Sequence, residues 1–204
     1  MAKFYFKYGA MGSSKTANLL MAAKNYDLQY KRVLVYKPSL DSRWSREKII
    51  SRSGVESRDC LIIPDGYQIF EDVKRDNQLD QVYCVLVDEV QFLTKEQIEA
   101  LSDIVDLLDI PVMCYGLTKT YKGSLFDGSK YLIELVDKLE EIKTTCAFCN
   151  KKATHNALFL DGKQALDGDD VIIGDTKVSK QFYLPVCRRH FKEPDLEKLN
   201  HFKK

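Results

Sequence analysis

Residues 8–18 read YGAMGSSKTAN, a short stretch in which an alternating apolar run gives way to a helical pattern. The run before it, residues 3–9, predicts a strand, and Lys15 begins the predicted helix. A strand, a glycine turn and a helix N-terminus form an anion site, because the first N–H groups of a helix lack internal partners and its dipole adds positive charge. The stretch predicts an α/β fold with a phosphate-binding loop. The alternative is a glycine turn before a surface lysine.

The loop departs from the pattern G-x-x-x-x-G-K-[ST] at one position, where Ser14 replaces the second glycine. Glycine is needed where φ is positive or where backbone approaches a ligand closely, and Gly9 and Gly12 remain for those purposes. We therefore expect a negative φ at Ser14. Lys15 would reach the β and γ phosphates, and Thr16 would offer its hydroxyl to Mg²⁺. The loop residues expected to bind the nucleotide are Gly9, Met11, Gly12, Ser13, Ser14, Lys15 and Thr16.

A pair of acids follows the most apolar predicted strand, in CVLVDEVQF at residues 84–92. In α/β sheets, ligands bind at the carboxyl edge, where the glycine loop also emerges. Asp88 therefore suits the support of Mg²⁺. Because successive strand side chains point to opposite sides, Glu89 is free to face a second substrate and accept its hydroxyl proton. The alternative is a solvent-exposed acidic turn. The loop and the acids together predict one Mg·ATP site.

The first two-thirds of the chain alternates predicted strands and helices, which indicates a doubly wound parallel sheet. Thr94 and Gln97 form a capping box before a helix that ends near residue 109. A further helix is expected over residues 124–142, with Leu132, Leu135, Val136 and Leu139 facing inward. The strands are expected at 3–9, 32–38, 60–64, 81–90 and 110–116, and the first helix at 15–26.

The sequence pattern changes from Lys143 onward, where short strand-like segments (ATHNALFL, DVIIG and QFYLPV) replace the strand–helix alternation. We place a boundary near Thr144 and Thr145. The expected division is a P-loop ATP-binding domain over residues 1–144, a small zinc-binding unit over 145–192 and a flexible charged tail over 193–204.

Two half-sites of metal-ligating residues lie in this later part, Cys146-x-x-Cys149 and Cys187-x-x-His190. Together they offer the four ligands of a closed, structural Zn²⁺ site, and a segment with little apolar mass would gain stability from the metal. The alternatives are unrelated thiol pairs or a redox C-x-x-C. A redox pair would need a helix N-terminus, which the flanking TTCAFCNKK does not indicate. His155 and His201 are expected to be bystanders.

Composition narrows the possible partners. The 204 residues carry a formal net charge of +1, which gives no bulk attraction to nucleic acid or to an anionic membrane. The apolar runs are far shorter than the ~20 residues that span a bilayer, and no signal peptide precedes the first strand. We expect a cytoplasmic protein. Cys60, Cys84 and Cys114 stand singly in apolar contexts and are interpreted as buried hydrophobes.

The motifs GAMGSSKT, VDEVQF, CYGLTKTYKGSLFDGS, DKLEEIKTTCAFC and YLPVCRRH resemble, in order and approximate spacing, those of the type II (cellular-type) thymidine kinases, whose zinc-binding domain carries a lasso over the base. The resemblance runs from about Phe4 to His190. It implies transfer of the ATP γ-phosphate to the 5′-hydroxyl of thymidine, and of deoxyuridine, giving dTMP and ADP in the nucleotide salvage that supplies DNA synthesis. It also implies Mg²⁺, structural Zn²⁺, a homotetramer and inhibition by dTTP.

The resemblance also assigns roles to individual residues. Glu89 matches the catalytic base, Asp88 supports the metal, and Arg43 reaches the phosphates near the transferred group. Gln91 is placed among the nucleotide-binding residues. The positions that match the nucleoside pocket are Met11, Phe92, Leu117, Tyr121, Phe126, Asn156 and Tyr183.

Two other classes of function compete with a kinase. The acidic DEVQ resembles a helicase box, and zinc ribbons often touch DNA, but a helicase closes ATP between two α/β domains and this chain has room for one. Its near-zero net charge also gives no reason to expect a continuous basic groove that could bind a nucleic-acid backbone. The other competitor is a zinc-stabilised regulatory module that binds ATP without transferring phosphate.

Overall fold

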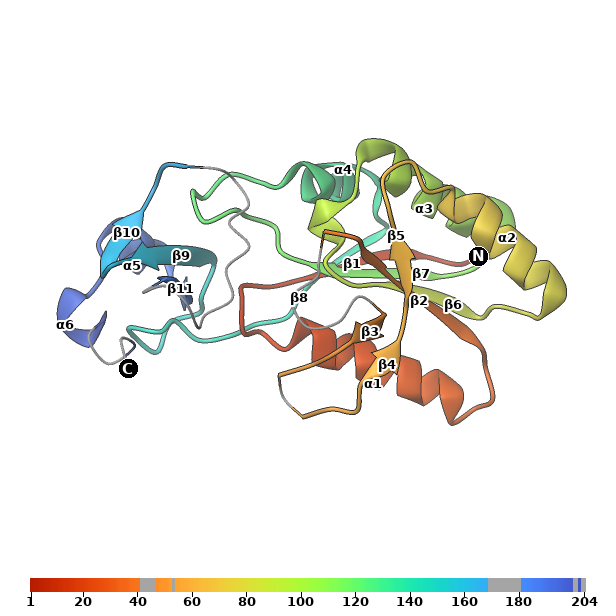
Figure 1. The fold of residues 1–204 in the computed structure, drawn as a ribbon, viewed down its shortest axis with the longest axis horizontal. Helices are drawn as coiled ribbons and strands as arrows, with labels where there is room; N and C mark the ends of the chain where they lie inside the picture. Colours follow the sequence, from red (N-terminus) through yellow and green to blue (C-terminus); the bar gives the residue numbers. More distant parts are fainter. Residues whose placement is uncertain (41–46, 53, 169–180, 200–201, 203–204) are drawn as a thin grey trace.

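The computed structural model describes residues 1–40, 47–52, 54–168, 181–199 and 202, and it contains a six-stranded sheet with helices on both faces (Figure 1). The strand order is β5-β2-β6-β7-β1-β8, and every neighbouring pair is parallel. This confirms the predicted doubly wound α/β fold. The strands are β1 (Phe4–Tyr8), β2 (Val33–Pro38), β5 (Leu61–Ile63), β6 (Cys84–Val87), β7 (Val112–Gly116) and β8 (Lys138–Glu141).

Strand alternation divides the core between the two faces. On β6, Cys84 and Leu86 pack with the apolar side of α1, whereas Val85 and Val87 pack with the helices opposite. Because this parity continues past the strand, position 88 falls on the α1 side. The helices are α1 (Lys15–Asp27) on one face, and α2 (Ile69–Leu79), α3 (Lys95–Leu108) and α4 (Asp127–Leu135) on the other (Figure 1).

The start of α3 is as predicted. The Thr94 hydroxyl accepts from the Gln97 backbone N–H at 3.3 Å, and the Gln97 side chain accepts from the Thr94 N–H at 3.1 Å. Both halves of the capping box are therefore present. Ile98, Leu101 and Ile104 are fully buried in the core on one face of the sheet.

The prediction of one helix over residues 124–142 was wrong. Helix α4 ends at Leu135, and residues 138–141 form β8, which pairs with β1 from Tyr5↔Lys138 to Tyr8↔Glu141. Leu132 is buried, but Leu135 and Leu139 are 43% and 49% exposed. The unpaired edge of β1 offers a full ladder of backbone partners, and this tertiary pairing outweighs the helix propensity of the segment.

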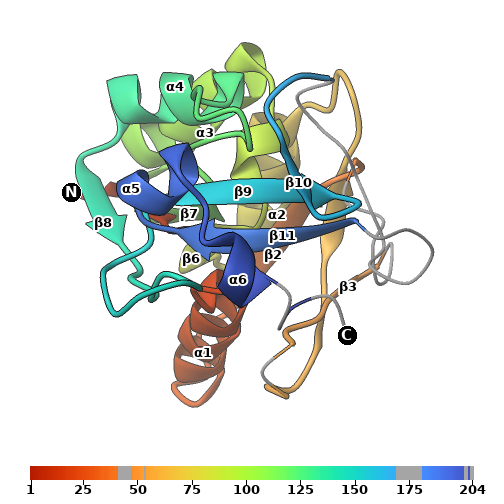
Figure 2. The same ribbon diagram turned by 90° about the vertical axis from the view of Figure 1, so that its left-hand side faces the viewer.

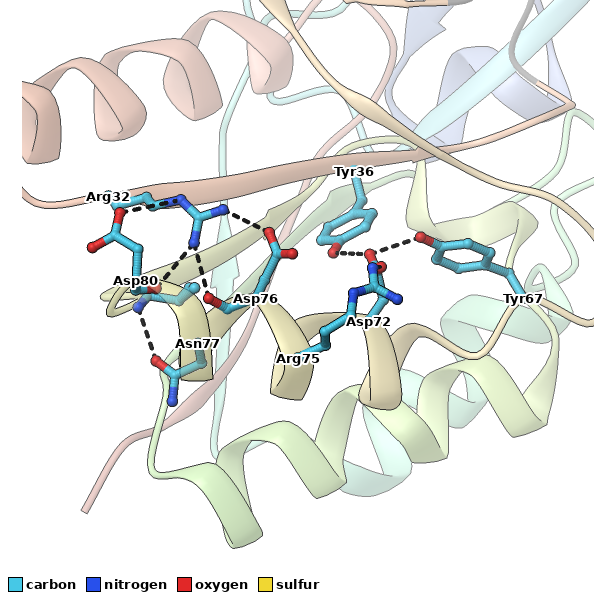
Figure 3. Close-up of polar contacts among 9 residues, drawn as sticks. Arg32, Tyr36, Tyr67, Asp72, Arg75, Asp76, Asn77 and Asp80 are labelled. Atoms are coloured by element: carbon cyan, nitrogen blue, oxygen red, sulfur yellow. Dashed lines mark hydrogen bonds and ion pairs between the residues drawn. The ribbon is translucent and has the colours of Figure 1, made fainter.

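Helix α2 was not predicted, because only Ile69 and Val73 form its buried stripe. A polar network docks it on β2 instead (Figure 3). The Tyr36 and Tyr67 hydroxyls donate to Asp72 Oδ2 at 2.8 and 2.7 Å, and Arg75 pairs with the other carboxylate oxygen. Near the end of the helix, Arg32 donates to the Asp76 carboxylate at 2.6 Å.

The later part of the chain forms a separate three-stranded antiparallel sheet of order β10-β9-β11. Figure 2 shows it lying across the end of the central sheet. Its elements are β9 (His155–Leu160), β10 (Lys163–Ala165), β11 (Gln181–Val186) and the helices α5 (Arg188–Lys192) and α6 (Leu196–Leu199). The strand-like DVIIG, residues 170–174, lies outside the described residues. A small hairpin, β3 (Lys48–Ile49) with β4 (Arg58–Asp59), and the 3-10 turn η1 (Val90–Phe92) complete the fold.

Candidate active site

A cavity of about 520 Å³ opens at the carboxyl edge of the central sheet. It lies where the loop after β1, the acids after β6 and the end of β2 meet, the edge at which α/β sheets bind ligands. Lys15 and Glu89 both line it, so the lysine and the acids face one space. The lining residues are Met11, Gly12, Ser14, Lys15, Thr16, Lys37, Lys48, Ile49, Ile50, Ser51, Arg52, Asp88, Glu89, Leu117, Tyr183 and Pro185.

The glycine loop wraps around the Lys15 side chain. The Lys15 ammonium donates to the carbonyls of Gly9 and Ala10 at 3.1 and 3.0 Å, and lies 3.4 Å from the Ser13 hydroxyl. A Cβ at Gly9 would sit 2.3 Å from the Ile142 carbonyl oxygen, so no side chain fits there. Gly12 has a φ of 73°. Both glycines are thus required by the loop, as predicted.

The expectation of a negative φ at Ser14 was wrong. Ser14 is the N-cap of α1 with φ 62° and ψ 30°, in the left-handed region, and its side chain makes no cap hydrogen bond. The loop must reverse direction immediately before the helix so that its N–H groups face the cavity, and a left-handed residue at that point produces the reversal. Serine accepts this conformation at a free-energy cost of roughly 1–2 kcal/mol.

Asp88 is buried, and its contact with Thr16 of α1 places it on the α1 side of the sheet, as strand parity predicts. The Thr16 hydroxyl donates to its carboxylate at 3.0 Å. Burial raises the pKa of Asp88, and the neighbouring Glu89 charge raises it further, whereas the Thr16 hydrogen bond and the Lys15 charge oppose that shift. A buried carboxylate in contact with a hydroxyl supplies two oxygen ligands of the kind that Mg²⁺ prefers, so these residues fit the ion.

Glu89 reaches the cavity by a different route from the one predicted. Strand β6 ends at Val87, so side-chain alternation does not direct Glu89. It occupies the left-handed region instead, at φ 49°, where the chain turns into η1. A non-glycine residue in this region stores strain, which is common at functional positions.

Gln91 holds the Glu89 carboxylate in place. Its Nε2 donates to Glu89 Oε2 at 2.6 Å, and its Oε1 accepts from the Leu117 N–H at 3.0 Å. The second bond fixes which end of the amide faces the carboxylate, because a backbone N–H can only donate. A Cβ at Gly116 would lie 2.5 Å from Gln91 Oε1, so this glycine makes room for the amide. Gln91 thus contacts the proposed base.

The residues expected around the nucleoside fall into three groups. Leu117 and Tyr183 line the cavity with Met11. Phe92 packs edge-on against Phe126 with ring centroids 5.8 Å apart. The remaining two expected residues make polar contacts. Tyr121 is almost fully buried, and its hydroxyl donates to the Asp167 carbonyl at 3.2 Å. Asn156 is also buried and accepts from the Met11 N–H at 2.7 Å.

Sequence reasoning missed three cations at the cavity, Lys37, Lys48 and Arg52, and it named one that lies outside the described residues, Arg43. Lys37 is 2% exposed, and its ammonium donates to the Lys48 carbonyl at 3.1 Å. Strand parity could have found it, since Val33 and Val35 also face the α1 side.

The cysteine cluster comes together as predicted. The ligand atoms of Cys146, Cys149, Cys187 and His190 all lie within 4.8 Å of one another. Cys149 Sγ and Cys187 Sγ are 3.9 Å apart, far beyond the ~2 Å of a disulfide and close to the ~3.8 Å edge of a tetrahedron with 2.3 Å Zn–S bonds. His190 Nδ1 lies 3.3 Å from Cys146 Sγ. The four residues therefore fit Zn²⁺.

His155 is not part of this cluster. It stacks on the Phe191 ring with centroids 4.5 Å apart. Burial lowers the pKa of His155 to about 4, and the charges of Lys119 and Arg188 lower it further. His201 lies outside the described residues.

A parallel sheet with a lysine-bearing phosphate loop and an acidic pair at the same edge defines a P-loop kinase-like fold, here with an added Cys3His unit. The particular family follows from comparison with known proteins. The chain belongs to the thymidine kinase family, whose family model, described as thymidine kinase, matches residues 2–191.

Curated relatives cover nearly the whole chain. The thymidine kinase of Enterococcus faecalis is 45% identical over 195 residues, which are 95% of this chain and 96% of the relative. That of Lactiplantibacillus plantarum is 44% identical over 194 residues, or 95% and 97% of the two chains. That of Streptococcus agalactiae serotype Ia is 42% identical over 196 residues, or 96% and 100%.

No helix in the described part of the chain combines the length and apolar composition that a bilayer crossing requires.

Proposed function

We propose that the protein transfers the γ-phosphate of ATP to the 5′-hydroxyl of thymidine, and to that of deoxyuridine, giving the 5′-monophosphate and ADP in nucleotide salvage for DNA synthesis. The observation that carries the proposal is the convergence of Lys15 and Glu89 on one cavity, in a chain 45% identical to a thymidine kinase. The Lys15 ammonium suits a triphosphate, and the Glu89 carboxylate suits the hydroxyl group of an incoming alcohol.

On the nucleotide side, backbone N–H groups at the start of α1 and the Lys15 ammonium hold the phosphates, with Gly9, Gly12, Ser13 and Ser14 shaping the loop. Thr16 and Asp88 would hold Mg²⁺, which would offset phosphate charge as the transferred group moves. By family likeness, Arg43 adds a planar cation near the transferred phosphate.

On the acceptor side, the Glu89 carboxylate takes the proton of the 5′-hydroxyl as the nucleoside oxygen bonds to the γ-phosphorus. The bond between the γ-phosphorus and the β–γ bridging oxygen breaks, and ADP leaves with that electron pair. Gln91 keeps the carboxylate oriented through its 2.6 Å hydrogen bond.

The thymine base occupies the part of the cavity that Leu117, Tyr183 and Met11 line. Tyr121 packs edge-on against Tyr183, and by family likeness Phe92 and Phe126, which pack edge-on against each other, also enclose the base. Asn156 reaches the same region from β9. By family likeness, backbone groups near Tyr183 read the thymine edge.

The remaining features are proposed on family likeness and on the cluster geometry. Zn²⁺ on Cys146, Cys149, Cys187 and His190 has a structural role, because all four positions are taken by protein ligands. We propose the division into residues 1–144, 145–192 and 193–204, a cytoplasmic location, a homotetramer and inhibition by dTTP.

The test is a panel of nucleosides with Mg·ATP, in which 5′-monophosphate and ADP formation are followed together. We expect thymidine and deoxyuridine to yield one ADP per monophosphate, and cytidine and purine nucleosides to yield neither. ATP hydrolysis stimulated by DNA, without nucleoside phosphorylation, would favour a motor instead. ATP binding with no transfer to any nucleoside would favour a regulatory module.

A further inference from the structure

The two faces of the sheet formed by β9 and β11 contact different parts of the molecule. Ala157 and Phe159 of β9 lie opposite Leu184 and Phe182 of β11, and this face packs on the cysteine cluster. The neighbouring positions point the other way, because strand side chains alternate. That second face carries Tyr183 and Pro185, which line the cavity, and Asn156, which lies directly opposite Pro185.

Asn156 makes the contact that joins this second face to the glycine loop. Its Oδ1 accepts from the Met11 N–H at 2.7 Å, across 145 residues of sequence. The amide orientation follows from the partner, since the N–H of Met11 can only donate. Asn156 is 4% exposed, so water cannot readily replace the acceptor. An N–H left without a partner there would be strongly unfavourable.

The contact matters because of what surrounds Met11. The residue stands between Ala10, whose carbonyl accepts from Lys15, and Gly12, where φ is 73°. Fixing the Met11 N–H therefore fixes the loop between the lysine-binding carbonyls and the turn into α1. The two proposed metal half-sites flank the sheet that carries Asn156, the residue that accepts this hydrogen bond. The geometry of the phosphate loop therefore depends on the C-terminal unit, which is distant from the loop in the sequence.

We propose that Asn156 is a positioning residue for the phosphate loop, through which the zinc-bearing unit holds the loop in its nucleotide-binding shape before ATP arrives. The inference deepens the proposed function and rests on it only for the identity of the substrates. It predicts an effect on ATP binding in the absence of any nucleoside.

The test compares nucleotide-free proteins by hydrogen exchange of the loop peptide that contains Met11, and by ATP affinity without nucleoside. Asn156→Leu keeps most of the volume and removes the acceptor, whereas Asn156→Asp keeps an acceptor in the same place. We expect about tenfold faster exchange and about tenfold weaker ATP binding in Asn156→Leu. Loop exchange in Asn156→Asp should stay near that of the wild type.

A matched control is Gln164→Leu. Gln164 likewise bonds its side-chain amide to the backbone, with Nε2 donating to the Phe191 carbonyl at 2.9 Å, but this bond is part-buried and lies within the C-terminal unit. It should leave loop exchange unchanged. Zinc content is measured in each variant, and Asn156→Ala replaces Asn156→Leu if the latter loses its metal.

Unchanged loop exchange and ATP affinity in both Asn156→Leu and Asn156→Ala would overturn the proposal, and a raised KM for thymidine alone would assign Asn156 to the nucleoside. Failure of the proposed function is a separate result. If the wild type phosphorylates no nucleoside, the exchange measurement still decides the role of Asn156.

Discussion

The two parts of the molecule that meet at the cavity are stabilised in different ways. Among the residues that the structure describes, the central sheet has 20 buried apolar residues in the cluster on one face and nine in that on the other. The described residues of the β9–β11 unit contribute eight, and two of these are the proposed zinc ligands Cys146 and Cys187. The sheet thus positions its reacting groups by topology and packing, whereas in the smaller unit the proposed zinc would help to hold Tyr183, Pro185 and Asn156 in place.

The largest expected effect would come from breaking the smaller unit. Cys187→Ser removes one of four ligands, and structural zinc contributes about 10–16 kcal/mol of apparent binding free energy in small domains. We expect zinc content to fall well below one per chain, and thymidine phosphorylation to fall at least a hundredfold. Atomic absorption and a kinase assay measure the two, with Cys60→Ser as the matched control outside the cluster. Full activity in a zinc-free Cys187→Ser protein would show that the units are not coupled.

A smaller effect is expected from a change within the larger part. Gln91→Leu removes the donor to Glu89, and a misplaced base slows transfer by about ten- to a hundredfold. The fall should appear in kcat, with zinc content unchanged. Gln97→Leu is the control, since Gln97 is a buried glutamine at the start of α3 that caps a helix and bonds to the Pro64 carbonyl. Equal losses of kcat in the two variants would contradict the orienting role of Gln91.

The stability of the sheet should depend on pH through Asp72. Burial raises the pKa of Asp72, but hydrogen bonds from Tyr67 and Tyr36 and the charge of Arg75 outweigh it and hold the pKa below its usual value. A carboxyl with a depressed pKa stabilises the fold above its unfolded pKa of about 3.9, and this contribution is lost as the pH falls through the folded value.

Asp72→Asn should therefore lower the free energy of unfolding by about 1–3 kcal/mol near pH 7, with the difference from wild type shrinking below about pH 4. Urea titrations at several pH values measure it, and zinc content should not change. A difference that is the same at pH 7 and at pH 3 would mean that the Asp72 charge does not stabilise α2 on β2.

The smallest expected effect is a gain in stability. Ser14 holds φ 62° without a cap hydrogen bond. Ser14→Gly should raise the free energy of unfolding by about 1 kcal/mol, because glycine adopts this conformation without strain. Chemical denaturation measures the gain, and Ser13→Gly is the control beside it. A loss of stability in Ser14→Gly would show that the serine side chain contributes more than its backbone conformation costs.

Sequence reasoning succeeded where a local pattern and sheet topology agree. The Thr94–Gln97 box, the acids after β6 and the two metal half-sites could all be placed before any coordinates. It failed where long-range contacts determine the local structure. Residues 138–141 have helix propensity but pair with the edge of β1, and α2 is held by a polar network that no apolar stripe reveals. Ser14 and Glu89 both adopt left-handed conformations that residue type alone argues against.

The Asn156–Met11 contact is another feature that the sequence alone did not predict. It joins residues 145 positions apart, and no spacing rule relates them. Lys37 differs, because strand parity with Val33 and Val35 would have been sufficient to place it on the α1 side of the sheet, although it was not predicted.

The central claim is that Glu89 acts on a nucleoside hydroxyl at the site where Lys15 holds ATP. The most direct test is single-turnover transfer from γ-labelled ATP to thymidine by Glu89→Gln, with ATP affinity and zinc content measured on the same preparation. The account predicts that transfer slows by about 10²–10⁴ while ATP affinity and zinc stay near wild type. Transfer at the wild-type rate would contradict it.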